Sequence, residues 1–326
     1  MHFRTEIPIT PSSERISLQT PVLTIGSCFA EVIGNRLSDN KIPALANPFG
    51  TIFNPVSMAK LLKQTIDNQS PDEDLYVENQ GVWFHYDFHS SLWGNDKAEL
   101  AERLTQKMQE VKNWLQKTDF LIFTFGTAFV YRHLETNQIV ANCHKTPAHY
   151  FRKELLTIET ILDDFKKLVQ QIDNRHSKLA IILTVSPVRH TKDTLPLNAV
   201  SKSILRVACH QLCESHPDFH YFPAYELLLD DLRDYRFYKS DLIHPSEVAE
   251  DSIFEQFSAT YFEKSLQQFM AEWTKIRQSL AHRPLQPNTI THRKFLENLL
   301  DKLQRLTEKV DVQLEIEQVK GQIKAI

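Results

Sequence analysis

The fold of this chain is decided by the stretch Val22-Leu-Thr-Ile-Gly26-Ser27-Cys28-Phe29-Ala30, in which a short apolar run meets a segment of helical period. Residues 22–25 form the run, and residues 30–37 place apolar side chains three and four apart, as on one face of a helix. A continuous apolar run is typical of a parallel strand that is covered on both faces. The stretch therefore predicts a buried strand, a tight turn at Gly26 and a helix.

The same alternation continues along the chain. Further strands are predicted at 120–125, 179–185 and 220–222, and a hairpin at 130–140. Helices are predicted at 56–66, 98–116, 155–172, 199–213 and 248–280, the last of them long and interrupted. Strand and helix in alternation predict an α/β fold: a doubly wound, mostly parallel sheet flanked by helices in three layers, as in flavodoxin.

The C-terminal part differs from the rest and predicts a helical extension. Residues 1–283 are expected to form the α/β domain and 284–326 a tail, with Pro284-Leu-Gln-Pro287 as the linker. Apolar residues of the tail recur three and four apart: Leu296, Leu299, Leu303, Leu306 and Val310. Because they cover only about two heptads, the tail is expected to dock on its own domain. A homodimer through the C-terminal helix is the alternative.

Composition excludes several classes of protein. Lys plus Arg number 37 against 41 Asp plus Glu, a net charge of −4 that gives no reason to expect nucleic acid or an anionic membrane as partner. The first residues lack an apolar signal segment, and no run reaches the ~20 residues of a membrane span. Four cysteines are too few for a disulfide scaffold and suggest a reducing compartment. A cytoplasmic location is therefore expected.

Glycine is scarce, with only 7 residues, so each is expected to mark a place where a Cβ would clash. The patterns Gly-x-Gly-x-x-Gly and Gly-x4-Gly-Lys-Ser/Thr are both absent. Without them, a nucleotide site loses its main support in the sequence, and no cofactor is expected.

Polar residues follow three of the predicted strands at the points where the strands end. In an open parallel sheet, ligands bind beyond the carboxyl ends of the strands. The residues at these ends are Gly26, Ser27 and Cys28 after the first strand, Gly126 and Thr127 after the second, and Ser186, Arg189 and His190 after the third. Their convergence predicts a functional site at this edge of the sheet.

The turn at Gly26 offers two candidate nucleophiles, Ser27 and Cys28, at the start of a helix. Unpaired N–H groups and the helix dipole favour negative charge there. They are expected to lower the pKa of the Cys28 thiol and to stabilise an oxyanion. The alternative is that Ser27 caps the helix and Cys28 is an inert, buried thiol.

A candidate acid–base pair lies in Asp241-Leu-Ile-His244-Pro245. An aspartate three residues before a histidine can accept the imidazole N–H, which fixes the tautomer and leaves the other nitrogen free as a base. Pro245 biases His244 away from helical conformation and presents it at a loop. The alternative is a surface loop in which the two residues have no shared role.

The two motifs together resemble those of the SGNH/GDSL hydrolases, where a Gly-Asp-Ser turn follows the first strand and an Asp-x-x-His lies near the end of the catalytic domain. Gly26-Ser27-Cys28-Phe29-Ala30 is itself the signature of the GSCFA-domain family, which is similar to that group. The resemblance spans roughly residues 15 to 260 and includes segments 47–50, 125–128, 142–145, 186–190 and 234–238.

The resemblance implies roles for individual residues. It aligns Cys28 with the nucleophile and puts Ser27 in place of the aspartate, so Cys28 is the favoured nucleophile and Ser27 the alternative. Gly50 matches the glycine that donates to the oxyanion in the second motif of the group.

The third motif departs from the pattern of the group. The chain has Gly126-Thr127-Ala128 where an asparagine donor is expected, so Thr127, Asn142 or backbone N–H groups would have to replace it. Loss of one such donor costs about 10²–10³ in rate, which puts simple esterase activity in doubt.

Other polar side chains are candidates for contact with the substrate. Asn142 and His144 are expected either in the wall of the pocket or in a solvated loop. Arg189 and Lys202 are candidates for holding an anionic group, although such side chains usually lie in solvent.

Two stretches have the spacing of metal ligands, although no metal site is expected. Cys209, Cys213 and His216 share one helix face, but leucines share it too, so core packing is the favoured interpretation. His85 and His89 lie among aromatic residues and favour a lid or the edge of a pocket.

The sequence thus predicts acyl transfer on an ester, with a carbohydrate or lipid ester implied only by the family. Cys28 or Ser27 attacks, His244 takes the proton and Asp241 orients His244. If water accepts the acyl group, the enzyme is an esterase. If another alcohol accepts it, the enzyme is an O-acyltransferase. A binding module that retains the pocket without the chemistry is the alternative, and a zinc protein built on the Cys209 helix is a third.

Overall fold

The centre of the protein is a sheet of five parallel strands, seen in a computed structural model that describes residues 5–173, 179–324 and 326. The strands are β1 (Val22–Gly26), β2 (Ala44–Ala46), β5 (Phe120–Phe125), β9 (Ala180–Val185) and β10 (Phe219–Tyr221). They lie in the order β10-β9-β5-β1-β2. From β1 the chain first winds toward β2 on one side and then toward β5, β9 and β10 on the other, so the order reverses between β1 and β5. Doubly wound sheets bind ligands at this reversal, beyond the carboxyl ends of the strands.

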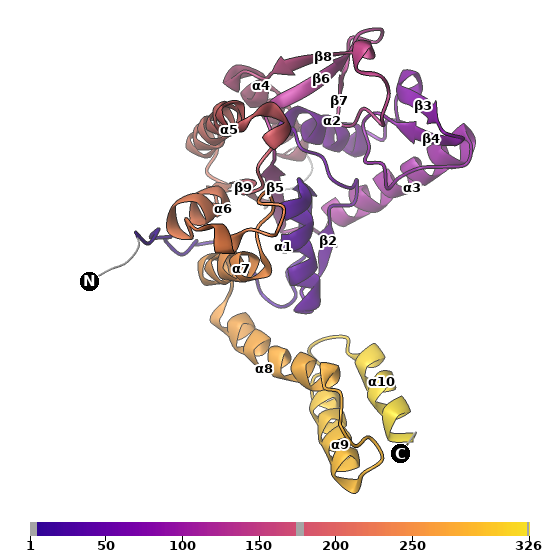
Figure 1. Ribbon diagram of the computed structural model, residues 1–326, viewed down its shortest axis with the longest axis vertical. Helices are drawn as coiled ribbons and strands as arrows, with labels where there is room; N and C mark the ends of the chain where they lie inside the picture. The colour runs from indigo at the N-terminus through magenta and orange to yellow at the C-terminus, as the bar shows by residue number, and fades with distance from the viewer. Residues whose placement is uncertain (1–4, 174–178, 325) are drawn as a thin grey trace.

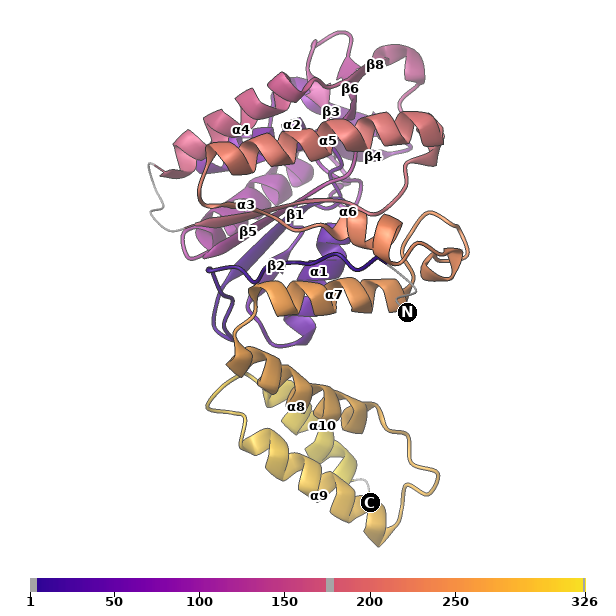
Figure 2. The ribbon, with the colours of Figure 1, turned by 90° about the vertical axis from the view of Figure 1, so that its left-hand side faces the viewer.

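Helices cover both faces of this sheet, as Figure 2 shows. One face packs against α2 (Pro55–Ile66), α3 (Lys97–Leu115), α4 (Ile158–Asp173) and α5 (Leu195–Ser215). The other packs against α1 (Cys28–Asp39), α7 (Glu247–Tyr261) and the short α6 (Ala224–Glu226), which a π-helical turn continues. The predicted three-layer α/β architecture is confirmed.

The three middle strands are buried on both faces, which explains their continuous apolar sequences. All residues of β1, β5 and β9 are buried, and successive side chains point to opposite layers. In β5, for example, Phe123 packs toward α4, while Ile122 packs in the core on the side of α1.

Two small antiparallel sheets lie beside the α2 and α3 layer (Figure 1). One pairs β3 (Tyr76–Asn79) with β4 (Val82–His85). The other has β6 (Phe129–His133) between β7 (Ile139–Val140) and β8 (Phe151–Leu155), and its β6–β7 pair is the predicted hairpin.

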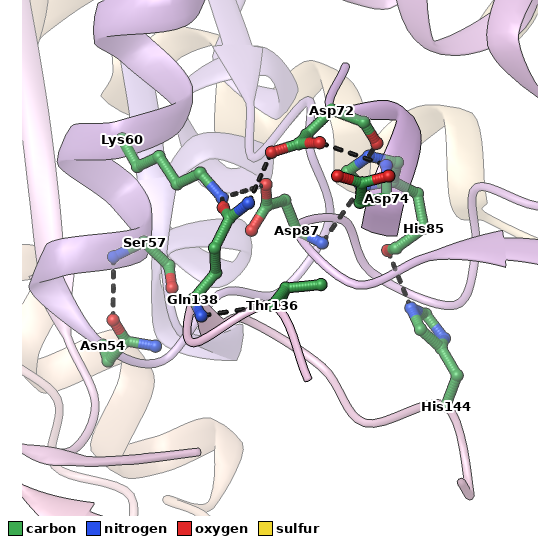
Figure 3. Close-up of polar contacts among 10 residues, drawn as sticks. All are labelled: Asn54, Ser57, Lys60, Asp72, Asp74, His85, Asp87, Thr136, Gln138 and His144. Atoms are coloured by element: carbon green, nitrogen blue, oxygen red, sulfur yellow. Dashed lines mark hydrogen bonds and ion pairs between the residues drawn. The ribbon is translucent and has the colours of Figure 1, made fainter. Parts of the chain in front are cut away.

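A buried polar cluster joins these sheets to α2 (Figure 3). Lys60 of α2 lies 2.6 Å from the carboxylate of Asp87, which is fully buried after β4. The same ammonium donates to Gln138 before β7, at 2.8 Å. Asp72, before β3, accepts from the Gln138 amide and from the ring of His85. Lys60 thus links two loops directly to a helix of the main domain, and Gln138 extends the link to Asp72.

The C-terminal helices form a bundle at one end of the molecule (Figure 1). They are α8 (Lys264–Ala281), α9 (Ile290–Gln304) and α10 (Gln313–Lys324). The predicted helix 248–280 is in fact α7 followed by α8. The chain breaks at Phe262, which is 2% exposed and pairs with Ile16 near the N-terminus. The predicted domain boundary, between residues 283 and 284, falls in the connection from α8 to α9.

The apolar stripe of the tail is covered within the chain. All five of its members are buried: Leu296, Leu299, Leu303, Leu306 and Val310. The bundle is tied to the α/β domain by an ion pair of 2.7 Å between Lys41 and Glu315 and by the Trp273 indole, which donates to the carbonyl of Asp39. The tail therefore docks on its own domain, and a homodimer would have to use another face of it.

Candidate active site

The turn between β1 and α1 can be built only with glycine at position 26. Gly26 has a φ of +147°, and a Cβ on it would lie 2.3 Å from the carbonyl oxygen of Thr124 in β5. Its amide donates to the side chain of Asn47 at 2.9 Å, and the amide of Ser27 donates to Thr124 at 3.0 Å. The turn is therefore clamped between the carboxyl ends of β1 and β5.

Ser27 and Cys28 have different environments. Ser27 is completely buried and caps α1, since its hydroxyl accepts the N–H of Phe29 at 3.3 Å. Cys28 is the first residue of α1 and is partly exposed. Of the two candidate nucleophiles, only the Cys28 thiol is both free of a capping role and open to the surface.

The pKa of Cys28 differs from the sequence-based expectation. Burial raises the pKa of the thiol, and this effect outweighs the lowering by the charge of Lys202 and by the N–H groups of Phe29 and Cys28. The carboxylate of Glu31, one turn further along α1, raises it further. The expectation that the helix N-terminus would lower the pKa of the thiol is therefore wrong for the net shift, because the turn is clamped into the interior and loses solvation, although the N–H groups do act in the expected direction.

Lys202 is an interior residue and not the exposed anion ligand that the sequence suggested. It projects from α5, is 1% exposed, and donates to the carbonyl oxygens of Gly126 and Ser186, at 2.7 Å each. These carbonyls belong to the residues that follow β5 and β9, so the ammonium joins two strand ends. Burial lowers the pKa of Lys202 to about 7, against the opposing influence of Cys28.

Asp241 and His244 form a compact side-chain pair in the loop before α7. Asp241 Oδ2 lies 2.7 Å from His244 Nδ1, and Oδ1 accepts the backbone N–H groups of Ile243 and His244 at 2.9 and 3.0 Å. Leu242 takes a φ of +59° to close this turn. The two N–H groups and the imidazole hold the pKa of Asp241 far below its usual range, so the carboxylate stays charged beside the ring.

The loop that carries this pair lies at the same edge of the sheet as Cys28. The amide of Arg189, four residues beyond β9, donates to the carbonyl of Ile243 at 3.3 Å. The guanidinium lies over the ring of Tyr238, 4.1 Å from its centre, and lines a hollow of about 320 Å³. Arg189 thus anchors the His244 loop to the end of β9. Its predicted contact with an anionic group of the substrate would be a separate role.

His190 is close enough to Lys202 and to His244 for both to influence its pKa, a relationship that the sequence did not reveal. Its ring packs edge-on against Phe53, with centres 5.1 Å apart, and its Nε2 is buried without a hydrogen-bond partner among the described residues. The pKa of His190 is lowered to about 4, mainly by burial and then by Lys202 and His244, against an opposing influence of Asp193. The imidazole is therefore neutral at pH 7.

The expected oxyanion donors are already engaged. The amide of Gly50 donates to Asn47 at 2.8 Å, and the amides of Gly126 and Thr127 share the carbonyl of Phe53 at 2.8 and 3.0 Å. The Thr127 hydroxyl lies 3.0 Å from that of Ser201. Neither the expected role of Gly50 as an oxyanion donor nor replacement of the missing asparagine by Gly126 or Thr127 is supported by this geometry, because each would have to give up an existing bond.

Asn142 and His144 form the wall of a hollow of about 470 Å³ that Phe84 and Trp93 also line. The Asn142 side chain accepts the amide of His144 at 2.9 Å, and the His144 ring stacks on Phe84 and bonds to the carbonyl of His85 at 2.9 Å. Within residues 5–173 and 179–324, no hydrogen bond joins this wall to Cys28. The two residues therefore line a hollow that has no hydrogen bond to the nucleophile turn, and a role in binding the substrate stays a prediction.

The stretches with metal-like spacing have structural explanations. Cys209 is fully buried in the core, and burial raises the pKa of both thiols, that of Cys213 to about 11. His85 accepts the amide of Asp87 and bonds through its other nitrogen to Asp72. In the described parts of the chain, no three metal-binding side chains cluster.

The fold and the edge just described define a doubly wound α/β protein with a thiol, a buried lysine and an Asp–His pair where its strands end. The chain belongs to the GSCFA family, whose sequence profile matches residues 21–257. A second profile, "GSCFA domain protein, C-terminal domain", matches residues 273–325, which contain the second half of α8 and all of α9 and α10.

Comparison with solved structures finds carbohydrate esterases. A Clostridium thermocellum family 3 carbohydrate esterase is 12% identical, with 79% of this chain and 99% of that chain covered and a TM-score of 0.32. A carbohydrate esterase family 3 protein from Talaromyces cellulolyticus is 8% identical, with 78% and 99% covered and a TM-score of 0.34. Likeness at this level does not bear on the activity of the chain. No curated protein matches it.

Across residues 5–173 and 179–324, every helix falls short of the length and apolar character that a bilayer crossing requires.

Proposed function

We propose that this protein is an acyl-transfer enzyme acting on an ester, with Cys28 as the nucleophile and Asp241–His244 as the acid–base pair. The observation that carries the proposal is the link between Arg189 and Ile243, 3.3 Å from amide to carbonyl, which fixes the His244 loop to the end of β9. Because the strands are parallel, that end lies on the same edge of the sheet as Cys28. Both partners of the chemistry thus belong to one edge.

The reaction proceeds through a thioester. The Cys28 sulfur adds to the ester carbonyl as its proton passes to Nε2 of His244, the C–O bond to the alcohol breaks, and the alcohol leaves with that proton. His244 then takes a proton from the incoming acceptor, whose oxygen displaces Cys28 from the acyl group, and the same proton passes to the departing sulfur. Asp241 holds the imidazole in the tautomer that leaves Nε2 free for these transfers.

The first turn of α1 supplies the donors for the oxyanion. The N–H groups of Cys28 and Phe29 already face the sulfur closely enough to lower the pKa of the thiol. The bond from Phe29 to the Ser27 hydroxyl is long, at 3.3 Å, so this N–H can turn toward a developing negative charge. These donors take the place of the asparagine that the sequence lacks.

Water and a second alcohol are both chemically competent acceptors of the acyl group, so the activity covers an ester hydrolase and an O-acyltransferase. A carbohydrate or lipid ester is the proposed substrate class, on the basis of the family resemblance. A non-catalytic binding module is the second candidate. It is favoured because the Gly50 amide and the Thr127 hydroxyl already form hydrogen bonds within the fold and so do not serve an oxyanion.

Probe labelling tests the proposal. A fluorophosphonate and iodoacetamide, each at neutral pH, are applied to wild type and to Cys28→Ala, Ser27→Ala and His244→Ala. His210→Ala is the matched control for His244, because His210 is an exposed histidine of α5. We expect labelling to be lost in Cys28→Ala and kept in Ser27→Ala, and ester turnover to be lost in His244→Ala but kept in His210→Ala. No labelling and no turnover on a panel of esters would favour the binding module.

A further inference from the structure

The hollow beside Arg189 has the composition of a site for an anionic ligand. Its volume is about 320 Å³. This lies at the small end of the range for sites that bind small molecules, about 300–1,000 Å³. Two arginines, Arg189 and Arg233, line it together with the rings of Tyr235 and Tyr238. A guanidinium is the side-chain group best suited to bind a carboxylate or a phosphate through paired hydrogen bonds.

The charges of the two arginines are not neutralised within the fold. Among the residues that the structure describes, no carboxylate forms an ion pair with the guanidinium of Arg189 or of Arg233. Asp234, the acidic residue of the lining, is already engaged, since its carboxylate lies 3.2 Å from Arg236 Nη2 and accepts the Arg236 amide at 2.9 Å. One exposed arginine would be ordinary, but two unpaired arginines that share a hollow are not.

Arg189 is held in position before any ligand arrives. Its guanidinium lies 4.1 Å from the centre of the Tyr238 ring and 5.5 Å from that of Tyr235. Nη1 makes a long hydrogen bond, 3.4 Å, to the carbonyl of Leu242. A guanidinium has several N–H donors, so this contact leaves others for a ligand. Because the side chain is already ordered, little conformational entropy is lost when an anion binds.

The hollow adjoins the loop that carries the proposed acid–base pair. Tyr238 of its lining forms a β-bridge with Pro245, and the amide of Lys239 donates to the carbonyl of His244 at 2.8 Å. In the proposed reaction His244 gives a proton to the leaving alcohol, so the alcohol oxygen lies next to His244. The part of the substrate nearest to the hollow is therefore the alcohol and not the acyl group.

We propose that the hollow binds an anionic group, a carboxylate or a phosphate, on the alcohol part of the ester, and that Arg189 and Arg233 hold it. The inference rests on the proposed function for the place of this group in the substrate. Leu228, Leu229 and the ring of Tyr235 also line the hollow. These apolar surfaces favour an anion attached to an apolar or ring-shaped body over a free inorganic ion.

Isothermal titration calorimetry tests the site without any turnover. The anionic probes are phenyl phosphate and 4-hydroxybenzoate, and 4-hydroxybenzamide is the neutral probe. Wild type should bind both anions, and the amide roughly tenfold or more weakly, because the amide lacks the charge that strengthens the hydrogen bonds. The anion that binds more tightly identifies the group as a phosphate or a carboxylate.

Arg233→Gln is the decisive variant, because Arg233 is exposed and its side chain has no partner among the described residues. It should raise the Kd of both anions roughly tenfold or more, through loss of a charge-assisted hydrogen bond. Arg293→Gln is the matched control, since it removes an exposed arginine of α9 and should leave the Kd unchanged. Absence of anion binding by wild type, or equal Kd values in the two variants, would overturn the inference.

Arg189→Lys keeps the charge but loses the planar fork, so it should also weaken anion binding while circular dichroism stays that of wild type. If this change disturbs the His244 loop, Arg233→Gln still decides.

Two esters that differ only in the alcohol part, 4-acetoxybenzoate and 4-acetoxybenzamide, connect the site to turnover. Arg233→Gln should raise KM for the anionic ester with kcat unchanged, and should leave KM for the neutral ester as in wild type. Anion binding without turnover of either ester would contradict the proposed function but not the anion site. Turnover of both esters with KM values that Arg233→Gln does not change would contradict the anion site but not the proposed function.

Discussion

Nδ1 of His244 lies 2.7 Å from Oδ2 of Asp241, and the other oxygen of Asp241 accepts two backbone N–H groups of the same loop. The carboxylate therefore does two things: it folds the loop and it orients the ring. A change that keeps the shape of Asp241 but removes its charge should separate these two roles.

Asp241→Asn is expected to lower ester turnover by about 10²-fold or more while the protein stays folded. The amide oxygen can still accept the N–H groups of Ile243 and His244, but its NH₂ group can face the ring and favour the wrong tautomer. Turnover with an activated ester, together with urea unfolding, measures both effects. Turnover close to that of wild type would mean that the pair is only a loop anchor.

Gly26→Ala should destabilise the fold by about 2–4 kcal/mol, because a Cβ at this position would lie 2.3 Å from the Thr124 carbonyl and φ is +147°. Gly321→Ala is the control, since Gly321 lies in helix α10 with nothing near the added atom. That change should raise the free energy of unfolding by roughly 0.5–1 kcal/mol. Equal effects in the two variants would contradict the clamped turn.

The free energy of unfolding should rise with pH between about 7 and 9. Lys202 has a folded pKa of about 7 and an ordinary value of 10.5, so the unfolded chain binds the extra proton in this range. Protonation of the buried Lys202 therefore destabilises the fold most below pH 7, and this penalty shrinks by about 1.4 kcal/mol per pH unit above it. Urea unfolding at several pH values measures the slope. Lys202→Met should flatten it, and an equal slope in that variant would contradict the burial of a neutral amine.

Lys60→Met is expected to cost about 3 kcal/mol of stability, because it leaves the Asp87 carboxylate buried without its cation. Lys63→Met, one turn further along α2, is a matched control. The Lys63 ammonium lies 2.8 Å from the carboxylate of Asp164, and both side chains are partly exposed. It should cost about 1 kcal/mol or less. Burial raises the pKa of Asp87, so the cost of Lys60→Met should shrink as the pH falls and the carboxyl takes a proton. A cost that is independent of pH would contradict an ionised Asp87 at neutral pH.

The main strands could be predicted because burial on both faces leaves a continuous apolar sequence. Residues 120–125 match β5 residue for residue, and residues 22–25 lack only the final Gly26 of β1. Strand β2 was missed, since Ala44–Ala46 is a three-residue edge strand whose sequence carries no strand signal. The break between α7 and α8 was not located either, because it depends on the pairing of Phe262 with Ile16, some 250 positions away in the sequence.

The site could be predicted in outline but not in its electrostatics. Spacing in the sequence was enough to suggest that Asp241 would hold His244, as the geometry now supports. It could not reveal that the amides of Gly126 and Thr127 would both bond to Phe53, or that α5 would bury Lys202 over two strand ends. Such facts depend on which groups lose contact with water, and that is decided by the packing of distant segments.

Intact-mass analysis of an acid-quenched reaction with p-nitrophenyl acetate tests the central claim most directly. The account predicts one acetyl group per chain, on Cys28, that is lost in Cys28→Ala and kept in Ser27→Ala. An acetyl group on Ser27, or one that survives in Cys28→Ala, would contradict it.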